Sequence, residues 1–291
     1  MAAGPAFHKP ETLDQAIALL AAAGEDGRPL SGGATLVAMI NAKLVQPASI
    51  VSLSGIEELK TISRAGDRTA RIGAMRRHRQ TAFESDLRGA QEVVSKAARQ
   101  IANPPVRNMG TIGGSVAFAD PAADYPPSLV AADASIELSG PDGKRVVPAE
   151  EFFLGWYETA LEPGEIISAI ILPPGPENAV GHYEKLCRVA GDFALASVAL
   201  VAGFDPDGSV SSLRIAVGGC GGGPVRVPAA EDAVIGRVPE KDVVAAAAAL
   251  LVEELDPVDD VRGSADYRLQ VVPGLLDRAM AAAKAQWEGN Q

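Results

Sequence analysis

The sequence is poor in cysteine, aromatic residues and histidine, and each shortage excludes a class of function. The two cysteines, Cys187 and Cys220, cannot supply the four thiolates of an iron–sulfur cluster, and we expect them to be a reduced pair. Aromatic residues make up only 4% of the chain, which argues against extensive base-stacking surfaces. His8, His78 and His182 are scattered without metal-ligand spacing, so we assign them no ligand role.

Basic charge and long apolar runs are also scarce. A formal net charge of −11 repels phosphate backbones and anionic lipids, which argues against nucleic acid as a partner. The longest apolar stretch, Phe193 to Phe204, is too short to span a bilayer, and the N-terminal residues include no apolar run of signal-peptide length. We therefore expect a cytoplasmic protein without a membrane span. The overall composition, 47% hydrophobic and 22% charged, is typical of a globular chain of one large or a few smaller domains.

Two glycine-rich stretches carry the most specific signal in the chain. The first is LSGGATL at residues 30–36, and the second is RNMGTIGGSVAFADPAADYPP at residues 107–127. Each has a Gly-Gly pair with Ser and Thr neighbours, and Asp120 and Asp124 follow the second pair. A Gly-Gly pair is usually only a turn, but two such stretches together suggest a ligand with two phosphates. Neither matches the Gly-x-Gly-x-x-Gly fingerprint, which disfavours an ordinary Rossmann site for NAD.

Hydrophobic periodicity predicts the elements around these stretches. Residues 10–24 read as an amphipathic helix, with Thr12 and Gln15 at capping-box spacing and Gly24 as the stop. Residues 28–30 and 49–53 read as short strands. Thr35 precedes a helical pattern, so the first stretch should link a strand to a helix N-terminus. Residues 89–101 read as a helix that Pro104 and Pro105 stop just before the second stretch, which we expect to be a loop.

Three parts are predicted: residues 1–54, 55–176 and 177–291. The run Pro173-Pro174-Gly175-Pro176 is the predicted linker before the last part. Strands of the middle part are predicted at 61–63, 69–74, 135–138, 144–147 and 165–172. In the last part we predict strands at 183–189 and 213–217, a strand or helix at 198–204, and helices at 241–255 and 265–285.

In its motifs the chain resembles the FAD-binding medium subunits of molybdenum hydroxylases, such as the carbon monoxide dehydrogenase medium subunit. The family pattern of a small residue, Gly-Gly, any residue and Ser or Thr matches residues 31–35. Thr-Ile-Gly-Gly matches residues 111–114, and Asp-Pro-x-x-Asp matches 120–124. Ser115 departs from the Asn or Asp that is usual there. Further similarity at 72–80, 161–173 and 183–200 extends in order over nearly the whole chain.

The resemblance implies an α+β fold of the FAD-binding PCMH type, with two N-terminal α/β subdomains and a C-terminal small antiparallel sheet with helices. The backbone and hydroxyls of the two Gly-Gly stretches would bind the pyrophosphate. The implied cofactor-binding residues are Leu30, Ser31, Gly32, Gly33, Ala34, Thr35, Leu36, Asn108, Thr111, Gly113, Gly114, Ser115, Asp120, Asp124, Leu161, Lys185 and Phe193.

Four of these residues have roles with open alternatives. Asp124 would take the ribityl hydroxyls or a flavin edge, or else cap a helix. Leu161 would pack along the isoalloxazine, or be a plain core leucine. Lys185 would place a positive charge near the flavin N1–O2 locus, or be a solvated strand lysine. Phe193 takes the place of a Tyr in the carbon monoxide dehydrogenase subunit and keeps the apolar face without the hydroxyl, or else is a buried core aromatic.

By the same resemblance, the chain is the FAD-carrying electron-transfer subunit of an oxidoreductase. The implied partners are a large molybdenum-cofactor subunit and a small [2Fe–2S] subunit, in a dimer of heterotrimers that passes electrons to an external acceptor. One alternative is a stand-alone NADPH-dependent flavoenzyme of the UDP-N-acetylenolpyruvoylglucosamine reductase type, which the similarity past Leu161 disfavours. The other is a flavin-free scaffold subunit, which the retained glycines and hydroxyls disfavour.

Overall fold

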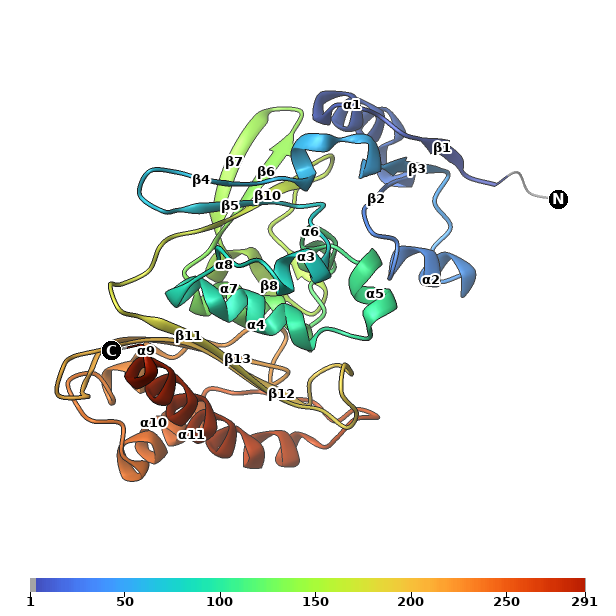
Figure 1. The fold of residues 1–291 in the computed structure, drawn as a ribbon. Coiled ribbons are helices and arrows are strands. Elements are labelled where there is room, and N and C mark those ends of the chain that lie inside the picture. The colour runs from blue at the N-terminus through green and yellow to red at the C-terminus, as the bar shows by residue number, and fades with distance from the viewer. Residues whose placement is uncertain (1–3, 291) are drawn as a thin grey trace.

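The N-terminal part is a three-stranded parallel sheet with a helix in each connection (Figure 1). The computed structural model describes residues 4–290. The elements of this part are β1 (Ala6–His8), α1 (Leu13–Ala23), β2 (Gly27–Leu30), α2 (Leu36–Asn41) and β3 (Ser49–Ser52), and the strand order is β1-β3-β2. Thr12 caps α1 by accepting a 3.3 Å hydrogen bond from the Gln15 N–H, as its position predicts. The predicted strand–Gly-Gly–helix link is also confirmed, whereas β1 was not predicted.

The middle part is built on a five-stranded antiparallel sheet. Its order is β4 (Ile62–Arg64), β5 (Ala70–Gly73), β10 (Ile166–Leu172), β6 (Ser135–Gly140) and β7 (Gly143–Pro148). The predicted hairpin is confirmed as β6–β7, and β10 is its neighbour at the centre of the sheet. A small two-stranded sheet, β8 (Phe153–Gly155) and β9 (Glu158–Thr159), follows the hairpin.

The middle part also contains short helices, most of which lie between the middle sheet and the C-terminal sheet in Figure 1, with α5 to one side. They are α3 (His78–Ala82), α4 (Glu92–Gln100), α5 (Pro104–Met109), α6 (Ile112–Phe118), α7 (Tyr125–Ala131) and α8 (Ala149–Phe152). Single 3₁₀ turns occupy Gly24–Asp26, Leu53–Gly55, Glu57–Lys60 and Gly89–Gln91.

The helix predicted at 89–101 is confirmed as the turn Gly89–Gln91 and α4, which ends at Gln100, before Pro104 and Pro105. These prolines begin α5, which was not predicted, because proline in a first turn lacks only an N–H that would have no partner inside the helix. One prediction about this helical layer was wrong. The second Gly-Gly pair does not lie in a loop but in the first turn of α6, which Thr111 caps by accepting a bond from the Gly114 N–H. The low helix propensity of glycine is overridden here by tertiary packing.

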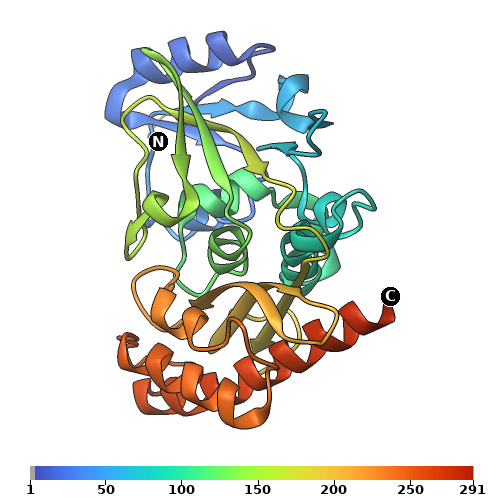
Figure 2. The same ribbon diagram turned by 90° about the vertical axis from the view of Figure 1, so that its left-hand side faces the viewer.

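The C-terminal part is a three-stranded antiparallel sheet covered on both faces (Figures 1 and 2). Its strands are β11 (Val180–Leu186), β12 (Ala196–Phe204) and β13 (Val210–Gly218), and its helices are α9 (Pro228–Asp232), α10 (Lys241–Glu253) and α11 (Ala265–Gly289). Val198 and Leu200 of β12 pack in the core of these helices, whereas Ala199 and Val201 pack in the core of the middle part. Because both faces of β12 are buried, residues 198–204 form a continuous apolar run without the alternation of a half-buried strand. For this reason the sequence pattern could not distinguish a strand from a helix there.

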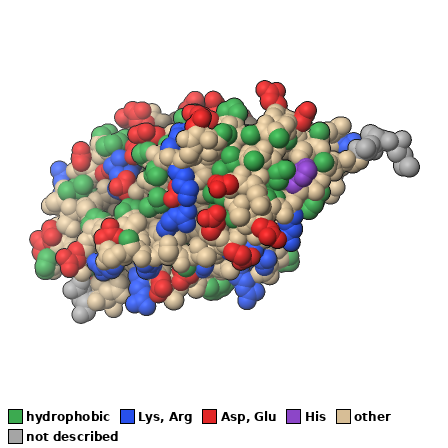
Figure 3. Space-filling model, turned by 90° about the horizontal axis from the view of Figure 1, so that it is seen from above, with side chains coloured by type: hydrophobic (Ala, Val, Ile, Leu, Met, Phe, Trp, Pro, Cys, Tyr) green, Lys and Arg blue, Asp and Glu red, His purple; other side chains and the backbone are tan. Residues whose placement is uncertain are grey.

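The predicted α+β fold with a C-terminal antiparallel sheet and helices is therefore confirmed. The proposed division at 54 and 176 stays a prediction. One hydrophobic cluster contains residues from both sides of the second boundary, such as Ile170 and Ala199, so the middle and C-terminal parts share a core. No helix within residues 4–290 is both long and apolar enough to cross a membrane. On the face seen in Figure 3, acidic and basic side chains are interspersed.

Candidate functional site

The two Gly-Gly stretches meet at a cavity of about 640 Å³, a size typical of cofactor sites. The first stretch reaches it from the β2–α2 link and the second from the first turn of α6. The predicted site residues that line the cavity are Ser31, Gly32, Gly33, Ala34, Thr35, Leu36, Thr111, Gly113, Gly114, Ser115, Asp120, Asp124, Leu161 and Phe193. Tertiary folding thus brings together residues from four separate regions of the sequence: 31–36, 111–124, Leu161 and Phe193.

Direct contact joins the two stretches. The hydroxyl oxygens of Ser31 and Thr111 are 2.6 Å apart and share a hydrogen bond. A Cβ added to Gly32 would lie 2.2 Å from the Met109 carbonyl oxygen and 2.8 Å from Gly110 Cα. Backbone atoms cannot move aside as a flexible side chain can, so residue 32 has to be glycine for the stretches to approach this closely.

The other glycines meet different requirements. Gly33 has φ 79°, in the left-handed region that favours glycine. A Cβ on Gly113 would lie 2.5 Å from the Ala74 Cβ, so this glycine lets α6 pack against the segment that follows β5. The Gly-Gly pairs therefore set the shape of the cavity as well as its chemistry.

Backbone donors differ between the two stretches. In the second, the N–H groups of the first turn are already used: Ile112 donates to the Arg76 carbonyl at 3.0 Å and Gly113 to the Ala74 carbonyl at 2.9 Å. In the first, no N–H from Gly32 to Thr35 donates to any group of residues 4–290. The first stretch thus has a run of unused donors beside the cavity, which is the arrangement that binds anions.

Asp124 is buried at the cavity wall, with 6% of its surface exposed. Its Oδ1 accepts hydrogen bonds from the Tyr183 hydroxyl at 2.7 Å and from Lys185 Nζ at 2.8 Å. Burial raises the pKa of this carboxyl, and the ammonium of Lys185 opposes that shift. Asp124 occupies the N-cap position of α7 but makes no side-chain cap bond, so the alternative that its side chain caps a helix was wrong.

Lys185 does not line the cavity. Its side chain is 1% exposed, and its Nζ also donates to the carbonyl oxygens of Gln100 at 2.9 Å and Asp192 at 3.0 Å. The alternative of a solvated lysine was therefore wrong. The positive charge of Lys185 is paired with the Asp124 carboxylate. The ammonium therefore lies behind the cavity wall, not on its surface.

Leu30 and Asn108 are the other two predicted residues outside the cavity lining. Leu30 is the last residue of β2, and Asn108 lies on α5 with its Oδ1 3.5 Å from an Arg79 nitrogen. Leu161 lines the cavity and also packs against the central core. Phe193 is 41% exposed, with the Arg262 guanidinium 5.2 Å from its ring centre, so the alternative of a buried core aromatic was wrong.

His78 lines the cavity although we gave it no role from the sequence. Its Nδ1 lies 3.2 Å from the buried Tyr125 hydroxyl. Burial, reinforced by the positive charge of Arg107, lowers the pKa of His78 to about 4, so the ring is neutral near neutral pH. The available signal was its place in IGAMRRHRQ, one of the segments of family similarity.

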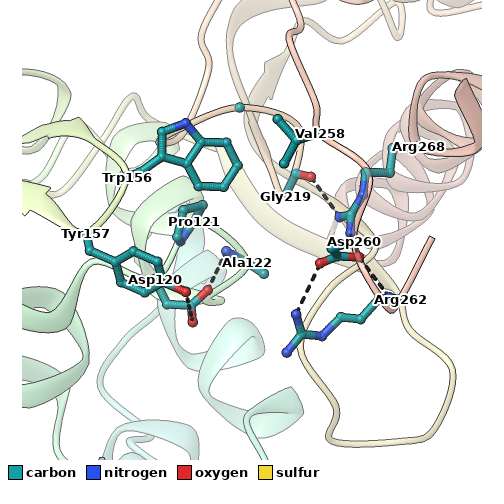
Figure 4. Close-up of a pocket in the computed structure, with 11 residues that line it drawn as sticks. Asp120, Pro121, Ala122, Trp156, Tyr157, Gly219, Val258, Asp260, Arg262 and Arg268 are labelled. Atoms are coloured by element: carbon teal, nitrogen blue, oxygen red, sulfur yellow. Dashed lines mark hydrogen bonds and ion pairs between the residues drawn. The ribbon is translucent and has the colours of Figure 1, made fainter. Parts of the chain in front are cut away.

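A second, smaller cavity of about 60 Å³ lies beside Asp120, which borders both cavities (Figure 4). Asp120 accepts from the Ala122 N–H at 2.9 Å and from the Tyr157 hydroxyl at 3.3 Å. Figure 4 shows Asp260 bridging Arg262 and Arg268 on the opposite side. This space has room for about two waters and is too small for a cofactor.

The described residues 4–290 contain no group of three His, Cys, Asp or Glu side chains placed to hold a metal ion. Both cysteines are free thiols. Burial raises the pKa of Cys220 to about 12, so this thiol is neither a nucleophile nor a ready ligand at neutral pH.

Comparison with known proteins agrees with this architecture. Residues 3–175 match the family model of the FAD binding domain in molybdopterin dehydrogenase, and residues 181–283 match that of the CO dehydrogenase flavoprotein C-terminal domain. The chain is 35% identical to the carbon monoxide dehydrogenase medium chain of Hydrogenophaga pseudoflava, over 96% of this chain and 97% of that one. It is 34% identical to the 6-hydroxypseudooxynicotine dehydrogenase complex subunit alpha of Paenarthrobacter nicotinovorans, over 94% and 92%. A solved carbon monoxide dehydrogenase from Hydrogenophaga pseudoflava superimposes with a TM-score of 0.93, at 36% identity, covering 98% of this chain and 99% of that chain.

Proposed function

Because the chain belongs to the FAD-binding medium subunits of molybdenum hydroxylases, we propose that it is the electron-transfer subunit of such an oxidoreductase and holds FAD in the cavity between the Gly-Gly stretches. The observation that carries this proposal is the contact between Ser31 and Thr111, at the point where both stretches border one cavity of about 640 Å³. The contact places the backbone donors of the first stretch and the hydroxyls of the second on one wall, where a ligand with two adjacent phosphates can reach both.

The donors suit a pyrophosphate. A chain with net charge −11 has to neutralise phosphates locally, and the unused N–H groups from Gly32 to Thr35 can do so. The N–H groups at the start of α6 are already bonded, so we assign the backbone donation to the first stretch. The second stretch would supply the Ser115 hydroxyl, for which no hydrogen bond is found within residues 4–290, and the steric room left by Gly114.

Other cavity residues suit the rest of the cofactor. Asp124 offers a carboxylate oxygen to ribityl hydroxyls, and Leu161 and Phe193 offer apolar surface to a flat ring system. His78 adds a neutral imidazole to the wall. We assign these residues to binding and orientation, and none of them to catalysis.

A bound flavin can exchange electrons one or two at a time, which amino-acid side chains do not do. The role of this chain is to hold and shield that group. Two cysteines cannot form an iron–sulfur cluster, so we propose that the clusters lie in a small [2Fe–2S] subunit and the molybdenum cofactor in a large subunit. We further propose a dimer of heterotrimers, an external electron acceptor, and recognition of the substrate by the large subunit.

Purification of the chain from its own organism, with the subunits that co-elute, tests this proposal. We expect one FAD per chain in the visible spectrum and after denaturation, and molybdenum and iron in the co-eluting subunits. A colourless protein that releases no flavin would establish the scaffold alternative. Rapid NADPH oxidation coupled to reduction of an enol ether by the isolated chain would support the reductase alternative, against which the match of residues 181–283 counts.

A further inference from the structure

Lys185 lies where three segments of the cavity wall come together. Its ammonium contacts Asp124 Oδ1 at 2.8 Å, the Gln100 carbonyl at 2.9 Å and the Asp192 carbonyl at 3.0 Å. A lysine ammonium has three donors and no acceptor, so these contacts use all of them. No donor is left for a ligand, and the side chain is 1% exposed.

Each of the three acceptors is linked to cavity-lining atoms. Asp124 lines the cavity itself. Gln100 is followed by Ile101 and Ala102, and Asp192 is followed by Phe193, all three of which line the cavity. One buried ammonium therefore holds the end of α4, the start of α7 and the loop before β12 in a common arrangement.

The same contacts orient the Asp124 carboxylate. Both Tyr183 and Lys185, which lie on β11, bond to Oδ1. Within residues 4–290, Oδ2 has no hydrogen bond, and it is not among the fully buried unpaired atoms. Oδ2 is thus the oxygen that a ligand in the cavity can reach.

The loop before β12 is also packed tightly against the end of α4. A Cβ on Gly191 would lie 2.5 Å from the Ala102 carbonyl oxygen, and Gly191 has φ 88°. This close approach brings the Asp192 carbonyl within reach of Lys185, and it leaves little room for the loop to shift while the three bonds hold.

We propose that Lys185 is the positioning residue of the FAD site, which aims one oxygen of Asp124 at the cofactor and holds the Ile101–Ala102 and Phe193 segments around it without touching the cofactor. This inference rests on the proposed function. It means that the C-terminal part, through β11, sets the affinity of a cofactor bound mainly by the two N-terminal parts.

The substitution Lys185→Met tests the proposal, because it keeps the length of the side chain and removes all three donors. The matched control is Lys96→Met: Lys96 is partly buried and also bonds to β11, at the Gly181 carbonyl, but does not line the cavity. FAD affinity is measured by quenching of FAD fluorescence on the full chain freed of its flavin. We expect Lys185→Met to weaken FAD binding about tenfold or more, and Lys96→Met to change it less than about twofold.

A second measurement separates positioning from stability. At saturating FAD, the visible circular dichroism of the flavin should differ from wild type in Lys185→Met and match it in Lys96→Met. If Lys185→Met does not fold, Lys185→Gln carries the test, since its shorter side chain keeps a polar group but cannot reach all three acceptors of the ammonium; we expect about threefold or greater weakening. Wild-type affinity and dichroism in Lys185→Met, or wild-type affinity in Lys185→Gln, would overturn the inference. Failure of the wild-type chain itself to bind FAD would instead refute the proposed function.

Discussion

Replacing Gly32 by alanine tests the contact on which the site depends. The added Cβ would lie 2.2 Å from the Met109 carbonyl oxygen, 2.9 Å from the Met109 carbonyl carbon and 2.8 Å from Gly110 Cα. All three neighbours are backbone atoms, so the β2–α2 link and the turn before α6 have to separate. Overpacking of this kind costs about 1–3 kcal/mol, and the separation also strains the 2.6 Å Ser31–Thr111 hydrogen bond.

The expected result for Gly32→Ala is a loss of about 1–3 kcal/mol in the unfolding free energy of the flavin-free chain and FAD binding weakened by about tenfold or more. Urea unfolding and FAD fluorescence titration measure the two effects. Gly66→Ala is the matched control, because within residues 4–290 no atom lies within 4 Å of the position that its Cβ would take, and the φ of Gly66 is not positive. Gly33→Ala should fall between them, since its φ of 79° costs about 1–2 kcal/mol for a non-glycine residue. If Gly32→Ala matched Gly66→Ala in both assays, the two stretches would not be in contact as described.

Three further predictions follow from the site and its surroundings. Thr111→Val removes the cap of α6 and the bond to Ser31, so urea unfolding should show a loss of about 1 kcal/mol or more; an unchanged midpoint would contradict the capping role. The pKa of His78 is lower in the folded chain, about 4, than in the unfolded chain, so its contribution to stability is present above about pH 6.5 and is lost as pH falls toward 4. The loss should reach about 3 kcal/mol and be absent in His78→Phe, and parallel stability–pH curves for the two proteins would refute it. Cys220 is fully buried with a raised pKa, so at about pH 8 it should resist a thiol reagent until the chain unfolds, and rapid modification of Cys220 in the folded chain would contradict the burial.

Prediction from sequence succeeded where the signal is local. Thr12 and Gly24 bound α1 because a cap and a left-handed stop act on neighbouring residues. The strand–Gly-Gly–helix link was equally local. Prediction failed where tertiary contacts compensate for poor propensity, as in α6, whose glycines are unfavourable in an isolated helix but are required by packing against Ala74.

The ligand class was readable from sequence because glycine pairs and hydroxyls are short motifs whose chemistry does not depend on distant residues. The sequence did not show which of the two stretches donates backbone hydrogen bonds to the ligand. Only the folded chain shows that the N–H groups of α6 are already bonded, that those of the first stretch are not, and that His78 borders the cavity. Asp124 meets Tyr183 across 59 residues of sequence, and both belong to elements whose burial is set by the whole core. Steric and conformational requirements are local properties of the chain, whereas burial and hydrogen-bond pairing are properties of segments that meet only after folding.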